Sequence, residues 1–154
     1  MAGSTRQDAG TLAGAGQEIA AIGRMLSEVY NARDFDRLDS VIAPDAEYRN
    51  VATGEVFRGA EGVKRYQRNW ASAFPESRVE IQNLAACGET VTVEFIGRGR
   101  HSGPLNTPQG TIQPTGKDVE LALCDVLSVR DGRITGGRTY FDLASLMRQL
   151  GVQG

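Results

Sequence analysis

One acidic residue stands out in a segment that otherwise alternates with apolar side chains. From Val119 to Val129 every second residue is apolar except Asp125, so a strand here would place this carboxyl on its apolar face. Burial without a partner is unfavourable for a carboxylate, and desolvation raises its pKa toward neutrality, where it can exchange protons. Asp125 is therefore a candidate general acid or base. The alternative is a structural ion pair with an arginine such as Arg100.

Three basic residues could complete such a site. His101 lies beside a long loop in the run Gly99–Gly103, where an imidazole could act as acid, base or hydrogen-bond donor. A structural histidine is the alternative. Arg98 and Arg100 share one strand face with Glu94. They form either an exposed ion-paired row or a cationic pocket wall that would stabilise an enolate or a carboxylate.

Aromatic and amide side chains could bind a ligand. Tyr48 and Asn50 are two residues apart in a segment expected to be extended, so both point to one side and could hold a substrate oxygen or a water. A solvated strand edge is the alternative. Tyr66, Trp70 and Phe74 have helical spacing and could form the floor of a pocket for a flat ligand, or simply belong to the core.

The elements that must position these residues follow from periodicity and from turn residues. Apolar spacing of three and four predicts helices, and period-two alternation between Arg78 and Phe141 predicts four antiparallel strands. The expected helices cover 17–30, 35–42, 58–74 and 143–150, the last capped by Asp142 and ended by Gly151; 46–51 is expected to be extended and 102–116 to be a loop. This order predicts an α+β fold: a cone-shaped barrel whose strongly curved antiparallel sheet packs around the N-terminal helices.

Composition limits the function classes. The 154 residues are 40% hydrophobic and 23% charged with a formal net charge of −2, which fits one domain, expected over 16–154 after a disordered tail over 1–15. No basic stripe suits nucleic acid, and no apolar stretch suits a membrane span, so we expect a cytoplasmic protein. Cys87 and Cys124 form no metal or disulfide pattern, and a single histidine excludes a multi-histidine site. We expect no cofactor and no metal.

A combination of short motifs resembles the SnoaL-like polyketide cyclases, within the nuclear-transport-factor-two-like superfamily. The motifs are Phe57-Arg58-Gly59 before the helix with Trp70, Gly99-Arg100-His101-Ser102-Gly103, Pro114-Thr115-Gly116-Lys117, Asp125 in its apolar strand, Asp131-Gly132-Arg133-Ile134, Asp142, and Leu146-Met147-Arg148-Gln149-Leu150-Gly151. The resemblance implies a cofactor-free enzyme of aromatic polyketide or secondary metabolism. Such an enzyme closes a ring by intramolecular aldol condensation in an apolar pocket.

The chain departs from the cyclase pattern at one position. The cyclases carry their general acid/base aspartate directly after the arginine of the last strand, but here Arg138 is followed by Thr139. Asp125 stands where the cyclases place a pocket histidine, so the resemblance implies that the acid/base has moved across the cavity. The candidate catalytic residues are Asp125, Arg100, His101 and Thr139. The candidate substrate-binding residues are Tyr48, Asn50, Tyr66, Trp70, Phe95, Leu123, Phe141 and Asp142.

Three other functions stay open. Limonene-epoxide-hydrolase-like proteins share the barrel, and the residues here that resemble theirs are Tyr48, Asn50, Arg138, Tyr140, Phe141 and Asp142. Two of their acids are replaced by Arg100 and Thr139. Anthracycline-type hydroxylases also lack the cyclase aspartate and would need a reductase partner. A non-catalytic binding module for a small hydrophobic polycyclic or polyketide ligand is the third. The family commonly forms homodimers through its sheets, so the resemblance implies a dimer here. The candidate interface is the strand face bearing Glu120, Ala122, Cys124, Val126 and Ser128.

Overall fold

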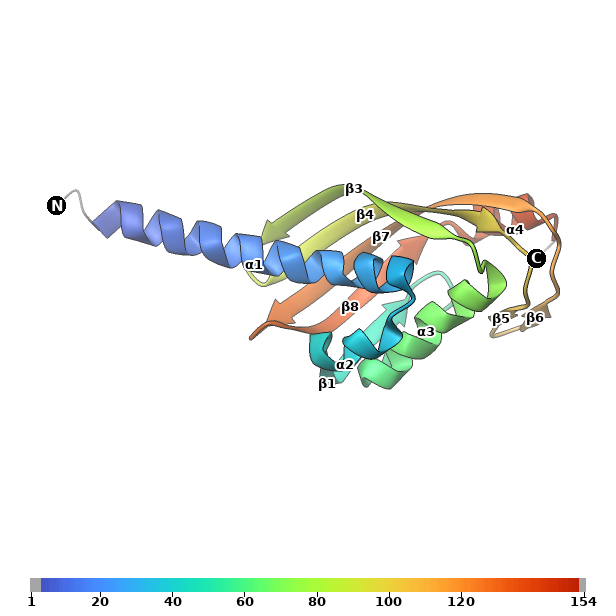
Figure 1. The fold of residues 1–154 in the computed structure, drawn as a ribbon, viewed down its shortest axis with the longest axis horizontal. Helices are drawn as coiled ribbons and strands as arrows, with labels where there is room; N and C mark the ends of the chain where they lie inside the picture. Colours follow the sequence, from blue (N-terminus) through green and yellow to red (C-terminus); the bar gives the residue numbers. More distant parts are fainter. Residues whose placement is uncertain (1–3, 153–154) are drawn as a thin grey trace.

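A curved six-stranded sheet with helices on one face forms the body of the protein (Figure 1). The computed structural model describes residues 4–152. Its elements in chain order are α1 (Ser4–Ala32), the 3-10 helix η1 (Phe35–Arg37), α2 (Leu38–Val41), β1 (Ile42–Asn50), β2 (Val56–Arg58), α3 (Gly59–Ala73), β3 (Arg78–Cys87), β4 (Thr90–Arg100), β5 (Leu105–Thr107), β6 (Gly110–Ile112), β7 (Asp118–Arg130), β8 (Arg133–Phe141) and α4 (Leu143–Leu150).

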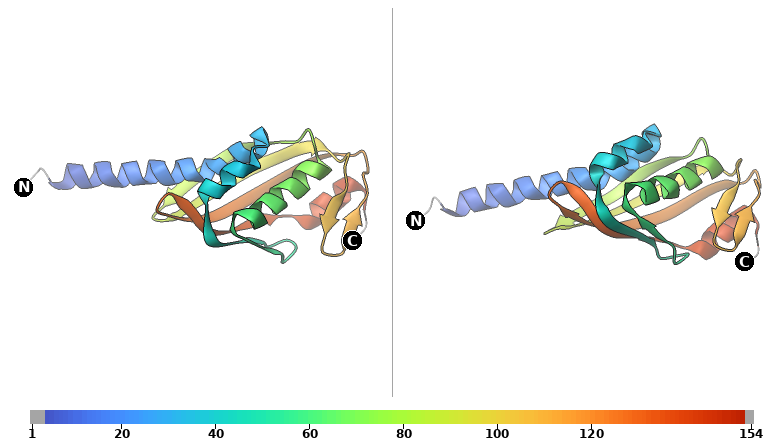
Figure 2. Two further views of the ribbon diagram at one scale, coloured as in Figure 1. Left: turned by 60° about the horizontal axis from the view of Figure 1, so that its bottom comes forward. Right: turned by 90° about the horizontal axis from the view of Figure 1, so that it is seen from below.

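The strands of the large sheet follow the order β2-β1-β8-β7-β4-β3. The four long strands after α3 pair antiparallel as predicted, whereas β1 joins the sheet parallel to β8, so the sheet is mixed. Helices α1, α2 and α3 lie on the same face of this sheet (Figure 2). The predicted α+β architecture is confirmed, and the helices and the concave face of the sheet enclose the interior.

The N-terminal helix is longer than predicted. Residues 1–15 were expected to be a non-periodic tail, but α1 begins at Ser4; residues 1–3 lie outside the described part. The segment contains Ala, Leu, Arg and Gln, which favour helix by intrinsic propensity even where no apolar stripe marks it. Periodicity therefore detected only the amphipathic part of the helix. The division into a tail and one domain stays a prediction.

Two other segments also differ from expectation. The helix expected over 35–42 is a 3-10 turn followed by one short α-helix, and β1 begins at Ile42, so Pro44 lies inside a strand. The loop expected over 102–116 contains a small hairpin in which β5 pairs with β6. In contrast, α4 begins and ends as predicted. At its start the Asp142 carboxylate accepts a hydrogen bond from the Ser145 amide (3.1 Å), and after its last residue Gly151 takes the left-handed conformation.

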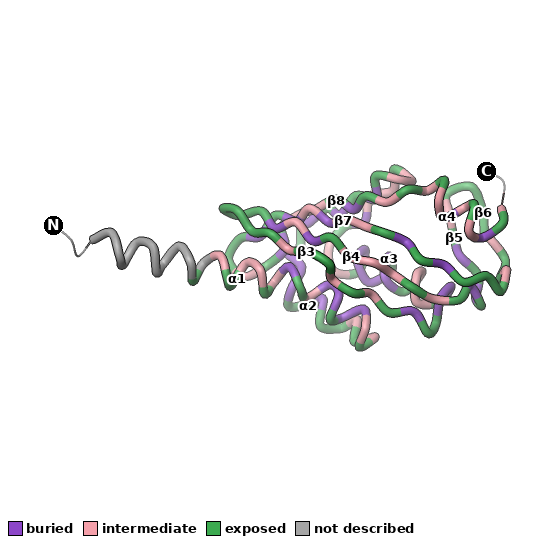
Figure 3. Tube along the Cα trace, turned by 90° about the horizontal axis from the view of Figure 1, so that it is seen from above, coloured by how far each residue is buried: buried purple, intermediate pink, exposed green. Residues whose placement is uncertain are grey.

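The buried residues form two clusters, and Figure 3 shows where along the helices and strands the buried positions lie. The larger cluster packs α1, α2 and α3 against the sheet around Val29, Leu38 and Leu127, which are all fully buried. The smaller one joins the end of α3 to β7 and α4 through Phe74, Leu121 and Leu146. Apolar burial of this kind is the main favourable term in folding, and here it fixes α3 above β7.

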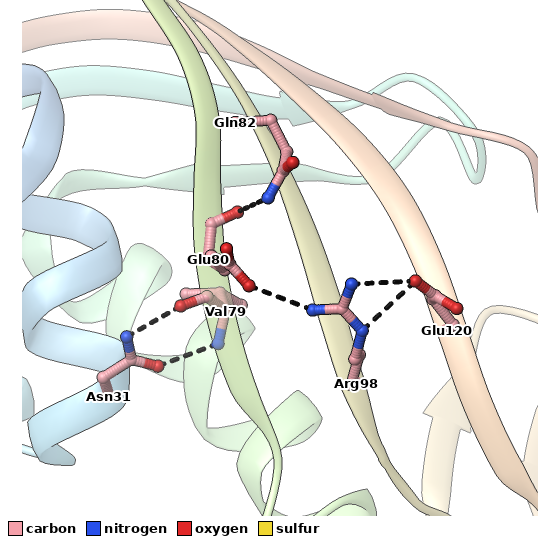
Figure 4. Close-up of polar contacts among 6 residues, drawn as sticks. All are labelled: Asn31, Val79, Glu80, Gln82, Arg98 and Glu120. Carbon is pink, nitrogen blue, oxygen red and sulfur yellow. Dashed lines mark hydrogen bonds and ion pairs between the residues drawn. The ribbon is translucent and has the colours of Figure 1, made fainter.

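Edge strand β3 is tied to the end of α1. The Asn31 side chain donates to the Val79 carbonyl (2.9 Å) and accepts from the Val79 amide (2.8 Å), as Figure 4 shows. This pair of bonds satisfies backbone groups that an edge strand otherwise leaves open. It also sets the spacing between α1 and β3, which form one side of the interior.

Among the described helices, none has the length and apolar character required to cross a membrane.

Candidate active site

An apolar cavity of about 90 Å³ lies between α1, α3 and the concave face of β3, β4 and β7. A buried water needs about 10–15 Å³ of such space, so the cavity has room for a small organic molecule. Six of the predicted site residues line it: Tyr48, Tyr66, Trp70, Phe95, Leu123 and Asp125. Alternate residues of β4 and β7 face inward, which is why period-two patterning located Phe95, Leu123 and Asp125 correctly.

Asp125 is the carboxyl group of this cavity. The residue is only 4% exposed, and its Oδ1 accepts a hydrogen bond from the Tyr48 hydroxyl at 2.9 Å. Burial raises the pKa of Asp125 to about 6, although nearby hydroxyl groups of Thr139 and Tyr48 lower it in part. The carboxyl can therefore gain and lose a proton near neutral pH, which is the property of a general acid or base.

Thr139 lies directly opposite Asp125 on the neighbouring strand β8. It is fully buried, and its Oγ1 has no hydrogen bond of good geometry in the described part of the chain. The hydroxyl still lies near enough to lower the pKa of Asp125. The acid/base was expected to have moved across the cavity, but Thr139 and Asp125 are cross-strand neighbours. Relative to the position that the cyclase pattern gives the acid/base, here Thr139, the carboxyl has therefore moved only to the neighbouring strand.

Two tyrosine hydroxyl groups accompany the carboxyl. The Tyr48 and Tyr66 rings meet edge to face with centroids 5.0 Å apart. The Tyr66 and Trp70 rings also meet edge to face, with centroids 6.5 Å apart. Burial and the Asp125 carboxylate raise the pKa of both tyrosines. Both hydroxyls therefore keep their protons at neutral pH. Tyr48 donates its proton to Asp125, so of the two it is Tyr66 that can donate to an oxygen in the cavity.

Arg100 does not belong to the site, contrary to the prediction. It lies on the outer face of the sheet, where its Nε pairs with Asp118 Oδ1 at 3.0 Å. Arg98 likewise bridges Glu80 and Glu120 on that face (Figure 4). Successive side chains of a strand point to opposite faces, and positions 98 and 100 alternate with the inward-facing residues of β4. These arginines therefore form the exposed ion-paired row and not a cationic wall of the cavity. None of these three ion pairs involves Asp125.

His101 is a structural residue in this fold. The side chain is fully buried, its ring packs against Phe74 with centroids 5.2 Å apart, and its Nδ1 accepts a hydrogen bond from the Thr115 amide at 3.1 Å. Desolvation lowers its pKa, which favours the neutral ring. The described residues that line the cavity do not include it. The imidazole instead ties the end of β4 to the loop before β7, so the predicted catalytic role is not supported.

Three predicted binding residues lie outside the main cavity. Asn50 and Phe141 border a smaller depression between β1, α3 and α4, to which Tyr66 and Trp70 also contribute. Asn50 points to the same side of β1 as Tyr48, but its Oδ1 accepts from the Ala52 amide (3.1 Å) and holds the turn that follows. The expected shared site of Tyr48 and Asn50 therefore does not form. Asp142 is exposed and caps α4.

Several polar cavity residues were missed from the sequence, namely Ser27, Tyr30, Gln67 and Ser77. Gln67 lies on the inner face of α3 beside Val63 and Trp70, lines the cavity and is 5% exposed. The signal was present, because a glutamine among apolar residues of a helix face is the helical counterpart of Asp125 in its strand. Within the described residues, no cluster of three or more His, Cys, Asp or Glu side chains is arranged to hold a metal.

The raised pKa of Asp125 predicts a pH-dependent stability. A carboxyl with a higher pKa in the folded state stabilises the fold below its unfolded pKa and loses that contribution as pH rises through the folded value. From 3.8 to about 6, the loss is about 3 kcal/mol at most. We expect Asp125→Asn to unfold at a higher urea concentration than the wild type at pH 8 and to lose this advantage at pH 4. Equal urea midpoints at both pH values would contradict the assignment.

The chain is similar to known proteins in sequence and in fold. A family model described as SnoaL-like polyketide cyclase matches residues 20–150. The epoxide hydrolase EphG of Mycobacterium tuberculosis is 28% identical over 130 residues, which cover 84% of this chain and 76% of EphG. The structure is also similar to IdmH of Streptomyces antibioticus, provisionally described as a polyketide cyclase, with 28% identity and a TM-score of 0.72 over 87% of this chain and 99% of IdmH.

A further solved structure shares the fold. AclR of Streptomyces galilaeus, provisionally described as a hydroxylase, is 21% identical with a TM-score of 0.73, covering 88% of this chain and 82% of AclR. At this identity the likeness concerns the fold alone.

Proposed function

Since the chain belongs to the SnoaL-like polyketide cyclase family, we propose that it closes a ring in a polyketide-type substrate by cofactor-free acid–base catalysis with Asp125 as the proton carrier. The observation that carries this proposal is the buried Asp125 carboxyl, with its pKa raised to about 6, on the wall of a mostly apolar cavity. Proton abstraction next to a carbonyl needs a base of this kind in a dry site.

The reaction would proceed through one enolate. The Asp125 carboxylate removes a proton from a carbon flanked by carbonyls, and the enolate carbon forms a bond to a second carbonyl carbon of the same molecule. The carboxylic acid then returns the proton to the new alkoxide, so the product is an isomer of the substrate and Asp125 is regenerated. Tyr66, which stays protonated, would donate a hydrogen bond to the oxygen on which negative charge develops.

The cavity walls would supply the remaining catalysis. Apolar side chains such as Phe95 and Leu123 exclude water from the enolate, and the confined space keeps the two reacting carbons of one molecule close together. These contributions need no further titratable group. The residual activity of variants without a proton carrier would come from this confinement.

The proposal is tested by product analysis. Purified protein is incubated with polyketide methyl esters that can form one or two rings, with simple epoxides, and with tricyclic aromatics plus oxygen, NADPH and a reductase. The expected result is an ester-derived isomer of unchanged mass, formed faster than without protein. Products that gain only the mass of an oxygen atom from the aromatics, or unchanged esters throughout, would overturn it.

Epoxide hydrolysis is the second candidate, and the similarity to EphG over 84% of the chain favours it. Hydrolysis needs an activated water and an acid for the epoxide oxygen. Asp125 and Tyr48 could activate the water, and Tyr66 could donate to the oxygen. Arg100 and Thr139, which the resemblance places where acids occur in that family, add no carboxyl to this cavity. A product heavier by one water would favour this reaction.

The Tyr48 hydroxyl offers a test in which the pKa of Asp125 is changed while its carboxyl group is kept. Its hydrogen bond stabilises the carboxylate and lowers the pKa of Asp125, so Tyr48→Phe removes that effect. We expect the acid limb of the kcat/KM profile for ring closure to move to higher pH in Tyr48→Phe. Tyr66→Phe is the matched control, because its hydroxyl has no such effect on the pKa of Asp125. Equal shifts in the two variants would contradict the role of Tyr48.

The predicted dimer surface stays a proposal. Glu120, Ala122, Cys124, Val126 and Ser128 lie on the outer face of β7, away from the cavity. If a homodimer forms through this face, each copy would keep a complete site. Gel filtration with light scattering would decide between monomer and dimer.

A further inference from the structure

The cavity contains a hydrogen-bond acceptor that the proposed chemistry does not use. Gln67 projects from α3, and its Nε2 donates to the Leu26 carbonyl of α1 at 2.9 Å. Its Oε1 is buried and has no hydrogen-bond partner in the described part of the chain. A buried carbonyl oxygen without a partner is unfavourable by about 1–3 kcal/mol, so it calls for a partner that the protein alone does not provide.

The orientation of this amide is fixed by its surroundings. Turning the amide over would bring Oε1 against the Leu26 carbonyl oxygen, which would replace a hydrogen bond by a repulsive contact. The amide oxygen must therefore remain the free group. Gln67 lines the cavity beside Trp70, so its amide belongs to the wall that a ligand in the cavity would contact.

Two hydroxyl groups on this side of the cavity bond to each other. The Tyr30 hydroxyl and the Ser77 Oγ are 2.6 Å apart, and both residues line the cavity. Gln67 lies on the α1 side of the cavity, whereas Asp125 lies on β7 beside Tyr48. The cavity thus has an acid–base group on its sheet wall and an unpaired acceptor on its helical wall.

We infer that Gln67 Oε1 accepts a hydrogen bond from a hydroxyl group of the ligand, so that the site selects ligands carrying a phenolic or enolic hydroxyl. A ketone oxygen cannot serve, since two acceptors do not bond. The ligand would then be oriented by its hydroxyl on α3 while its carbonyl-bearing part faces Asp125. This inference rests on the proposed function only in taking the cavity as the ligand site.

Binding of unreactive probes tests the inference separately from catalysis. The probes are α-tetralone and its isomers with one hydroxyl on the aromatic ring, and dissociation constants are measured by calorimetry. One neutral hydrogen bond corresponds to about tenfold in affinity, so at least one isomer should bind the wild type about tenfold more tightly than α-tetralone. In Gln67→Met, which keeps the side-chain length, that isomer should bind no better than α-tetralone.

A matched control separates the cavity from general effects of losing an amide. Gln149 bonds to the backbone of Glu120 through both ends of its amide and lies away from the cavity, so Gln149→Met should keep the tenfold preference. Should Gln67→Met fail to fold, the Nε2 resonance of Gln67 in the wild type should shift with the hydroxylated probe and not with α-tetralone. A preference that survives in Gln67→Met, an absent preference in the wild type, or an unmoved resonance would overturn the inference. Loss of ring closure with the hydroxyl preference intact would instead count against the proposed function.

Discussion

Replacement of Asp125 by asparagine is expected to lower the rate of ring closure by roughly 10³-fold, within the range that a positioned general base contributes. The amide keeps the size of the side chain and can still accept from Tyr48, as the carboxylate does at 2.9 Å. It cannot take up a proton. The quantities to compare are kcat at saturating substrate and kcat/KM at limiting substrate. Both are measured with the polyketide ester that turns over fastest.

Asp118 supplies the matched control for this substitution. It lies on the same strand but on the outer face, where it pairs with Arg100, and surface pairs of this kind contribute little to stability. Asp118→Asn should therefore retain wild-type turnover. Full turnover in Asp125→Asn would show that the proton is carried by another group and would remove the cyclase mechanism proposed above.

A methyl group at Gly103 is expected to destabilise the fold by about 4 kcal/mol, at the upper end for a single substitution. A Cβ at this position would lie inside van der Waals contact with the Ser72 carbonyl oxygen, which is backbone and cannot rotate away. The Gly103 amide also donates to the Ala73 carbonyl (3.1 Å) and closes the loop onto the end of α3. Urea unfolding of Gly103→Ala measures the loss.

Gly97 provides the comparison for Gly103. A Cβ there would meet the Val79 side chain at 3.7 Å, an ordinary contact, so Gly97→Ala should change the free energy of unfolding by less than about 1 kcal/mol. Because Gly97 lines the cavity, this variant also reduces the space for a ligand. Similar urea midpoints for the two variants would mean that the loop at Gly103 can move away from α3.

Periodicity predicted much of the fold and part of the site. Period-two alternation placed Phe95, Leu123 and Asp125 on the inner face, and helical spacing placed Tyr66 and Trp70 above them. These predictions succeeded because each depends on local geometry, which a single element determines. The same reasoning marks any polar residue on an apolar face, and it would have found Gln67 had it been applied to α3 as it was to β7.

Predictions that depended on tertiary placement failed. The sequence pattern allowed Arg100 either on a pocket wall or in an exposed ion-paired row. The pairing of β4 with β7 decides this, because it brings Asp118 opposite Arg100 on the outer face. His101 follows β4 at the point where the chain leaves the sheet, so its surroundings depend on the loop that returns through Thr115. The parallel pairing of β1 with β8 likewise joins distant segments, and nothing in either segment alone indicates it.

If burial makes Asp125 a proton acceptor near neutral pH, its carboxyl group must titrate there, and a ¹³C NMR titration of the aspartate carboxyl carbons measures this. Comparison with Asp125→Asn assigns the resonance without requiring a substrate. We expect a midpoint at a pH of about 6 for the Asp125 resonance. A midpoint near 3.8, the ordinary value for this side chain, would mean that water reaches the carboxyl freely, and it would contradict the proposed role of the cavity.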